Sequence, residues 1–210
     1  MDIHRVYKIF QQYFRKKRMI WFEKHFKVSD ITKILDVGED QYNWQFLSHK
    51  PNIKIINLFK PDNWNDKLTN FQFEIGNGTS ISYPDNTFDI VYSNSVIEHL
   101  GSWSNQKLFA KEILRVGKFI YVQTPAKEFL VEPHLITPFI HWFPLIWQSK
   151  LLRNFTLWGL ITRPSKSYVD AFLAERRLLS LKEFKELFVG CEIMRERSCF
   201  FTKSYIAVRY

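Results

Sequence analysis

The stretch of residues 88–100, FDIVYSNSVIEHL, constrains the fold of this chain more than any other. It follows a turn-like YPDN sequence at residues 83–86 and opens with a short run rich in apolar and β-branched residues. Such a run between turn residues is typical of a buried parallel strand. The small polar residues 93–95 then come at the carboxyl end of that strand, where open α/β sheets bind their ligands.

Apolar runs of strand length alternate with helical patterns along the first two thirds of the chain. Strands are expected at residues 31–38, 53–59, 71–75, 88–94 and 118–123, and helices at about residues 42–49 and 105–116. This alternation predicts right-handed βαβ units and a mostly parallel sheet.

The C-terminal segment returns to the same rhythm. Residues 180–183, SLKE, form a capping box and predict a helix that ends at Gly190. Residues 192–201 and 204–210 predict two closing strands with a turn at residues 202–203. A hairpin of this kind forms an antiparallel pair at the sheet edge.

The N-terminal segment is basic and amphipathic. Residues 1–27 hold eight Lys or Arg and two acidic residues, in a chain whose net charge is +9. Its apolar residues recur at helical spacing: Ile3, Val6, Tyr7, Phe10, Tyr13 and Phe14. We favour a helix packed on the core with its charges in water over a helix that binds a membrane or phosphate. No nucleic-acid motif is present, and nucleic acid is not an expected partner.

Residues 126–168 break the strand and helix rhythm with several prolines and tryptophans. Their apolar stretch at residues 135–147 is too short and too rich in proline to span a bilayer. Two interpretations compete: a hydrophobic cap over a substrate pocket, which we favour, and a membrane-facing patch. The expected organisation is a basic helical cap (1–28), a Rossmann-like core (29–125), an insertion (126–170), and a C-terminal helix with the closing hairpin (171–210).

The remaining compositional signals concern cysteine, histidine and targeting. Cys191 and Cys199 would lie too far apart on one extended segment to form a disulfide, which favours a reducing compartment. The charged N-terminus lacks the apolar region of a secretory signal, so the cytoplasm is the expected location. The histidines show no paired spacing, and no metal site is expected.

Residues 76–79 (GNGT) and 84–99 (PDNTFDIVYSNSVIEH) resemble the fourth-strand region of class I S-adenosylmethionine-dependent methyltransferases. Residues 122–125 (VQTP) and 132–134 (EPH) are similar to a bacterial subgroup of type 11-like methyltransferases. The resemblance implies a Rossmann-like α/β fold, with a seven-stranded, mostly parallel sheet, an antiparallel C-terminal strand and helices on both faces. It also implies S-adenosyl-L-methionine as the cofactor and methyl transfer as the reaction.

The resemblance assigns cofactor-binding roles along the carboxyl ends of the first four strands. The sequence ILDVGEDQY at residues 34–42 matches the first strand and glycine turn of the family. Asn57 takes the place of the acid that meets the ribose, and Asn77 is placed at the adenine amine. The full set of expected cofactor residues is Asp36, Gly38, Glu39, Asn57, Asn77, Gly78, Thr79, Ser93 and Asn94.

Two departures from the family pattern open an alternative. The later glycines of the first turn are absent, with the larger, negative Glu39 and Asp40 in this loop, and no acidic residue ends the second strand. The alternative is a degenerate methyltransferase fold that acts as a binding or partner protein without catalysis.

The expected acceptor is a small molecule or a lipid-like compound, with peripheral contact to an anionic membrane as a compatible feature. Methyl transfer requires the methyl donor and the acceptor atom to be held in line. An oxygen or nitrogen acceptor can also require a base that removes its proton. His99 and His134 are the candidate bases, and a structural role is the alternative for His99. Glu132, His134 and Trp142 are the candidate substrate residues. The acceptor itself and the oligomeric state are left open by the sequence.

Overall fold

The computed structural model describes residues 3–132, 137–198 and 200–210. A seven-stranded sheet forms its centre, in the order β3-β2-β1-β4-β5-β9-β8. The first five strands are parallel, and β9 runs antiparallel to both β5 and β8. The prediction of a mostly parallel sheet with an antiparallel C-terminal strand is confirmed. The strands are β1 (Lys33–Val37), β2 (Asn52–Asn57), β3 (Phe71–Ile75), β4 (Phe88–Asn94), β5 (Gly117–Pro125), β8 (Glu192–Ser198) and β9 (Phe201–Arg209).

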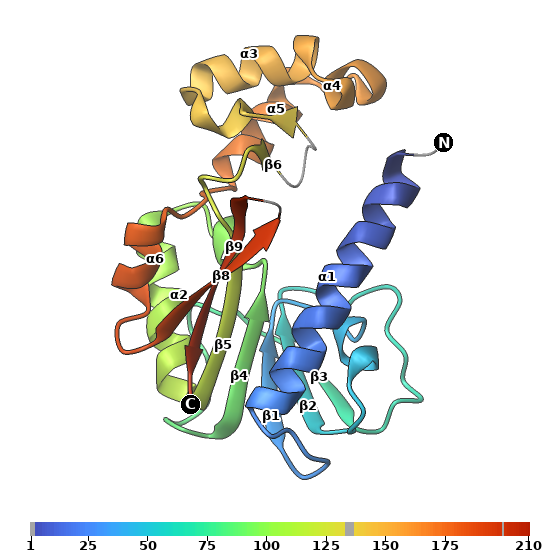
Figure 1. The fold of residues 1–210 in the computed structure, drawn as a ribbon, viewed down its shortest axis with the longest axis vertical. Coiled ribbons are helices and arrows are strands. Elements are labelled where there is room, and N and C mark those ends of the chain that lie inside the picture. The colour runs from blue at the N-terminus through green and yellow to red at the C-terminus, as the bar shows by residue number, and fades with distance from the viewer. Residues whose placement is uncertain (1–2, 133–136, 199) are drawn as a thin grey trace.

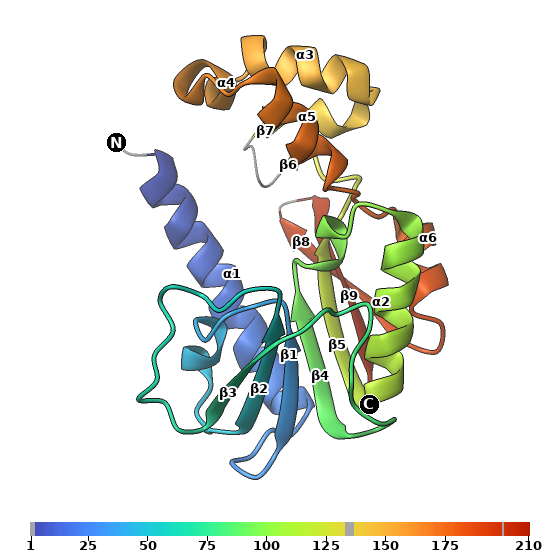
Figure 2. The same ribbon diagram turned by 180° about the vertical axis from the view of Figure 1, so that it is seen from behind.

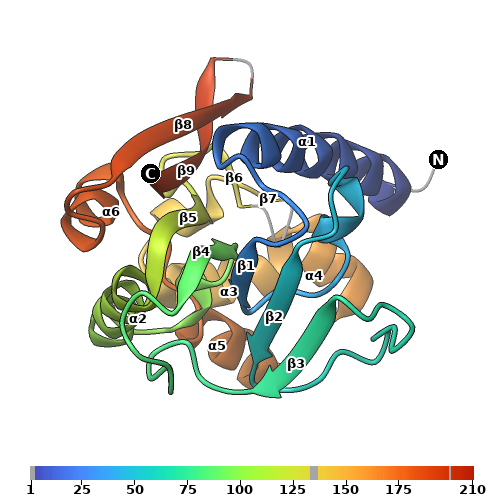
Figure 3. The ribbon, with the colours of Figure 1, turned by 90° about the horizontal axis from the view of Figure 1, so that it is seen from below.

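Helices cover both faces of the sheet (Figures 1 and 3). Helix α1 (Ile3–His25) crosses one face, and α2 (Trp103–Val116) and α6 (Leu181–Leu187) lie on the other. Successive strand residues point to opposite faces, so each buried strand contributes to two cores. The α1 core contains Phe22, Ile34, Ile55, Tyr92 and Tyr121, and the α2–α6 core contains Leu35, Val91, Phe109, Val122 and Phe184.

The helix expected at residues 42–49 is only a short 3₁₀ turn, η1 (Asn43–Phe46). Its Trp44 is buried against α1, with ring centroids of Trp44 and Phe22 5.9 Å apart. Helix α1 therefore covers the sheet where a crossover helix would normally pack. The expectation was wrong because the apolar pattern of this segment reflects burial beneath α1.

The predicted capping box is present at Ser180 and Glu183, and α6 begins directly after it. The hairpin turn, by contrast, lies between Ser198 and Phe201, which are partners in the register, and not at residues 202–203. Lys203 belongs to β9 and packs over the Phe14 ring of α1, at 3.6 Å from its centroid. Lys203 is thus part of the paired strand, and the pairing of β9 with β8 extends past the expected turn.

The insertion forms a small helical unit above the carboxyl edge of the sheet (Figures 1 and 2). We call this unit, residues 126–174, the cap. It contains β6 (Val131–Glu132), β7 (Thr137–Pro138), η3 (Ile140–Trp142), α3 (Leu145–Phe155), α4 (Leu157–Thr162) and α5 (Lys166–Ala174). Its own core is small, with Ile140, Leu152 and Val169 buried. No helix in the described part of the chain is long and apolar enough to cross a bilayer.

Candidate functional site

The glycine turn after β1 is tightly enclosed. Gly38 has φ +94°, and a Cβ at this position would lie 2.6 Å from Cγ2 of Val96. Its N–H donates to the Ile56 carbonyl of β2 (2.8 Å). A residue with a side chain would meet both a backbone penalty and a collision, so the turn requires glycine.

Asp36 is completely buried beneath this turn. The Trp44 indole N–H donates to Asp36 Oδ2 (2.6 Å). Burial holds the Asp36 pKa well above its usual range, and the nearby Glu39 carboxylate raises the pKa further. The structure thus places Asp36 under the turn as its support, while a direct cofactor contact stays a prediction.

A chain of polar side chains links α1 to the tips of β1 and β4. Asn94 Nδ2 donates to Glu39 Oε1 (2.6 Å), and Arg18 Nη1 donates to Asn94 Oδ1. Arg18 Nε also lies 3.2 Å from Glu196 Oε1 of β8, and each of these two side chains is only 13% exposed. The expected residues Glu39 and Asn94 therefore lie together, and an arginine of α1 joins them.

Arg18 was not predicted as a site residue, because the charges of the N-terminal helix were expected to lie in water. The spacing of Arg18 before Phe22 and Phe26 gives a signal, since residues four apart share a helix face. Phe22 and Phe26 are buried. Lys203 also lies in this region, and burial lowers the Lys203 pKa to about 8.

The carboxyl ends of β2 and β3 present an exposed apolar surface. Asn57 and Ile75 are register partners, so the segments that follow these strands lie side by side. The side chains of Leu58, Phe59 and Ile75 are 65–73% exposed. Large apolar side chains exposed together mark a site for a planar or apolar ligand.

The amides of this region have different roles. Asn57 Nδ2 donates to the Gly38 carbonyl (3.1 Å), which ties the end of β2 to the glycine turn. Asn77 is exposed, and its Oδ1 accepts from both N–H and O–H of Thr79 (each 2.9 Å). A Cβ on Gly78 would lie 2.8 Å from the Phe109 ring, so this loop is packed against α2. Ser93 Oγ donates to the Val37 carbonyl (2.9 Å) and joins β4 to β1.

The candidate acceptor residues are placed more sparsely. His99 is exposed at the end of η2 (Ile97–His99). Glu132 ends β6, and His134 lies outside the described residues. The Trp142 indole N–H donates to the Lys127 carbonyl (3.0 Å), and His141 Nε2 lies 3.0 Å from the same oxygen. Trp142 therefore ties η3 to the segment that directly follows β5.

Two cavities flank this edge of the sheet. One of about 230 Å³ lies between α1 and the β8–β9 hairpin and is lined by Arg18, Tyr121 and Glu196 among others. The other, of about 280 Å³, lies where the cap joins the core and is lined by Lys127, His141 and Arg177 among others. Both linings combine apolar and basic side chains, and the first also contains the carboxylate of Glu196.

Residues 40–119 match the family model of a methyltransferase domain. The fold is similar to an S-adenosylmethionine-dependent methyltransferase from Methanosarcina mazei, with TM-score 0.51, 14% identity, and coverage of 88% of this chain and 94% of that one. It is also similar to magnesium protoporphyrin IX methyltransferase from Synechocystis PCC 6803, with TM-score 0.59, 9% identity, and coverage of 100% and 88%. No curated protein matches the sequence.

Residues 40–119 are thus similar to a methyltransferase domain, and the chain as a whole has the fold of class I methyltransferases. The resemblance seen in the fourth-strand region is confirmed by the match over residues 40–119 and by the fold. The acceptor and the residues that bind each group are not fixed by this likeness.

The residues of the edge fit the cofactor that this class uses. Leu58, Phe59 and Ile75 offer an exposed apolar surface of the kind an adenine ring needs, next to the exposed amide of Asn77. At the other end, Gly38 forms the tight turn that a close backbone contact requires. The end of this edge at Leu58 and Asn77 is therefore more open than the end at Gly38, where hydrogen bonds join Glu39, Asn94 and Arg18.

Proposed function

We propose that this protein transfers a methyl group from S-adenosylmethionine to a small-molecule or lipid-like acceptor. The observation that carries the proposal is the exposed apolar surface beside Asn77, at the carboxyl edge of a class I sheet. In this proposal Leu58 and Ile75 hold the adenine, and the Gly38 turn holds the methionine end. Asn77 Oδ1 exchanges one of its two hydrogen bonds from Thr79 for one from the adenine amine. Asp36, Glu39, Asn57, Gly78, Thr79, Ser93 and Asn94 shape or line the same site.

The bound cofactor supplies an electrophilic methyl group on a sulfonium. The protein holds donor and acceptor in line and keeps water out, which accounts for most of the rate gain in such a displacement. The cap lies above the edge where the acceptor would enter (Figure 2). In the proposal His99 or His134 takes the acceptor proton, and Glu132, His134 and Trp142 contact the acceptor.

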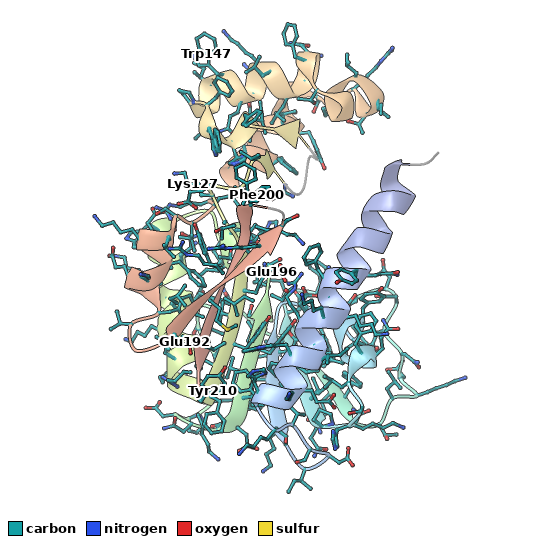
Figure 4. The ribbon with its side chains drawn as sticks, viewed as in Figure 1. Lys127, Trp147, Glu192, Glu196, Phe200 and Tyr210 are labelled. Carbon is teal, nitrogen blue, oxygen red and sulfur yellow. The ribbon has the colours of Figure 1, made fainter. Side chains whose placement is uncertain are left out.

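An apolar acceptor is favoured by the side chains around this edge. Phe200 is fully exposed at the tip of the β8–β9 hairpin, at the end of the sheet that the cap covers (Figure 4). Neighbouring Phe201 is also exposed. The proposed setting is the cytoplasm, where a free thiol such as Cys191 persists.

A second candidate is a binding protein without catalysis. It is favoured by the hydrogen bonds from Arg18 to Asn94 and from Asn94 to Glu39, which close the methionine end of the site. In this case the protein would bind a nucleoside ligand or a partner protein and leave the cofactor unchanged.

Turnover distinguishes the two candidates. With methyl-labelled S-adenosylmethionine and either a bacterial lipid extract or a water-soluble extract, wild type is expected to form S-adenosylhomocysteine and one labelled product. Replacing the catalytic base, as His99→Gln or His134→Gln, should lower kcat by roughly 10²–10⁴-fold with unchanged affinity for S-adenosylhomocysteine. Tight binding without turnover in either extract would support the second candidate. Wild-type kcat in both variants would remove the histidines from the mechanism.

A further inference from the structure

The cap has a large apolar surface that the rest of the described chain does not cover. Among the apolar side chains of the cap that the structure describes, only Ile140, Leu152 and Val169 are buried in its own core. Many others are exposed: Phe139, Trp142, Phe143, Leu145, Ile146, Trp147, Phe155, Leu160, Ile161 and Tyr168. Exposed apolar patches of this extent on a soluble fold mark a surface that binds a partner or a membrane.

The charge of the same segment has one sign. The sequence contains no Asp or Glu between Glu132 and Asp170, although the chain holds 21 acidic residues in 210. Within this span lie Lys150, Arg153, Arg163 and Lys166, and all four are exposed. The surface is therefore complementary to an anionic partner.

Helix α3 mixes the two kinds of side chain on one face. Gln148 and Leu152 face the cap core. Ile146, Lys150 and Arg153 follow one another at spacings of four and three, so they share the opposite face. Trp147 borders this face, and Figure 4 shows it on the side of α3 that points away from the sheet.

A mixed face of this kind distinguishes a membrane from a protein partner. The buried centre of a protein interface is depleted in lysine. Helices that lie in the membrane interface instead combine Trp, Phe and Leu with Lys and Arg. Ile146 and Trp147 are 68% and 60% exposed, directly beside the two basic residues.

We infer that the outer surface of the cap, residues 139–168, is a peripheral membrane-binding surface for anionic lipid bilayers. Ile146 and Trp147 enter the boundary between headgroups and acyl chains, and Lys150 and Arg153 contact the lipid phosphates. Helix α4 packs closely on α3 beside this surface, because a Cβ on Gly159 would lie 2.0 Å from the Leu152 carbonyl oxygen. The inference does not depend on methyl transfer.

Vesicle flotation tests the inference on the full chain. Wild type is expected to float with vesicles that contain phosphatidylglycerol, and to bind pure phosphatidylcholine vesicles much more weakly. The double variant Ile146→Ser/Trp147→Ser should lose affinity by at least tenfold, since each side chain leaves the apolar zone. Lys150→Gln/Arg153→Gln should lose roughly 30-fold, about five-fold for each basic residue. Brominated acyl chains should quench tryptophan fluorescence in wild type and less so in the first variant.

The matched control replaces two exposed apolar residues that lie outside the cap. Ile31 and Val189 are 83% and 76% exposed, and Ile31→Ser/Val189→Ser should bind vesicles like wild type. Circular dichroism checks that every variant is folded. The inference is overturned if wild type fails to bind anionic vesicles, or if both cap variants bind as wild type does. It is also overturned if light scattering shows a dimer that Ile146→Ser/Trp147→Ser dissociates while vesicle binding persists.

Discussion

Arg18→Met is expected to lower the free energy of unfolding by about 3–5 kcal/mol, the usual cost of removing one partner from a buried ion pair. Arg18 donates to Asn94 and pairs with Glu196, both in places that water barely reaches. Methionine keeps much of the side-chain volume and removes only the charge and the hydrogen bonds. Without the guanidinium, the carboxylates of Glu196 and Glu39 would stay buried with less compensation.

Urea unfolding measures this effect. Lys16→Met is the matched control, because Lys16 is exposed two residues earlier on the same helix, and its midpoint should hardly change. A midpoint for Arg18→Met equal to that of wild type would show that the chain from α1 to the tip of β4 contributes nothing to stability. It would also remove the reason for treating α1 as part of the site.

Gly38→Ala is expected to destabilise the protein by about 2–5 kcal/mol and to weaken S-adenosylhomocysteine binding by more than tenfold. The positive φ of Gly38 costs an L-residue roughly 1–2 kcal/mol. The collision of the new Cβ with Val96 adds about 1–3 kcal/mol of overpacking. Affinity falls because any relief of the collision shifts the turn that the methionine end needs.

Two further variants separate the causes. Gly190 also has a positive φ (+83°), but a Cβ there would meet no atom within 4 Å, so Gly190→Ala should show the backbone cost alone. Gly38→Ala/Val96→Ala should recover the collision part and leave the backbone part, which a double-mutant cycle measures. A Gly38→Ala variant that unfolds like Gly190→Ala would mean that Val96 does not enclose the turn.

The parallel strands could be predicted because they are buried on both faces, which gives each of them a continuous apolar run. Such a run can be recognised in the sequence without knowing which strand pairs with it. The fourth strand, Phe88–Asn94, was found with its exact bounds. The capping box at Ser180 is equally local, since both of its hydrogen bonds lie within four residues.

Features that depend on contacts between distant residues were beyond the sequence pattern. The 3₁₀ turn η1 depends on the burial of Trp44 beneath α1. The Trp44 ring packs there against Phe22, which lies 22 positions earlier in the chain. Lys203, expected in the hairpin turn, lies in β9 and packs over the Phe14 ring. Arg18 reaches Asn94 across 76 positions. Each of these contacts involves α1. The face of α1 that packs on the sheet is marked by buried residues such as Phe22 in the C-terminal half of the helix.

The candidate site divides in the same way. Gly38, Glu39, Asn57, Ser93 and Asn94 were expected at strand ends, and the parallel register brings them to one edge. The exposed pair Leu58 and Phe59 belonged to an expected strand, and only the structure shows that their side chains are uncovered.

Calorimetric titration of the folded, full-length protein with S-adenosylhomocysteine tests the central claim most directly. We expect saturable heat with one ligand per chain, and at least tenfold weaker binding for Asn77→Ala, about 1.4 kcal/mol, with unchanged folding. Absence of heat with both S-adenosylhomocysteine and S-adenosylmethionine would contradict the account and leave only the architecture of the fold.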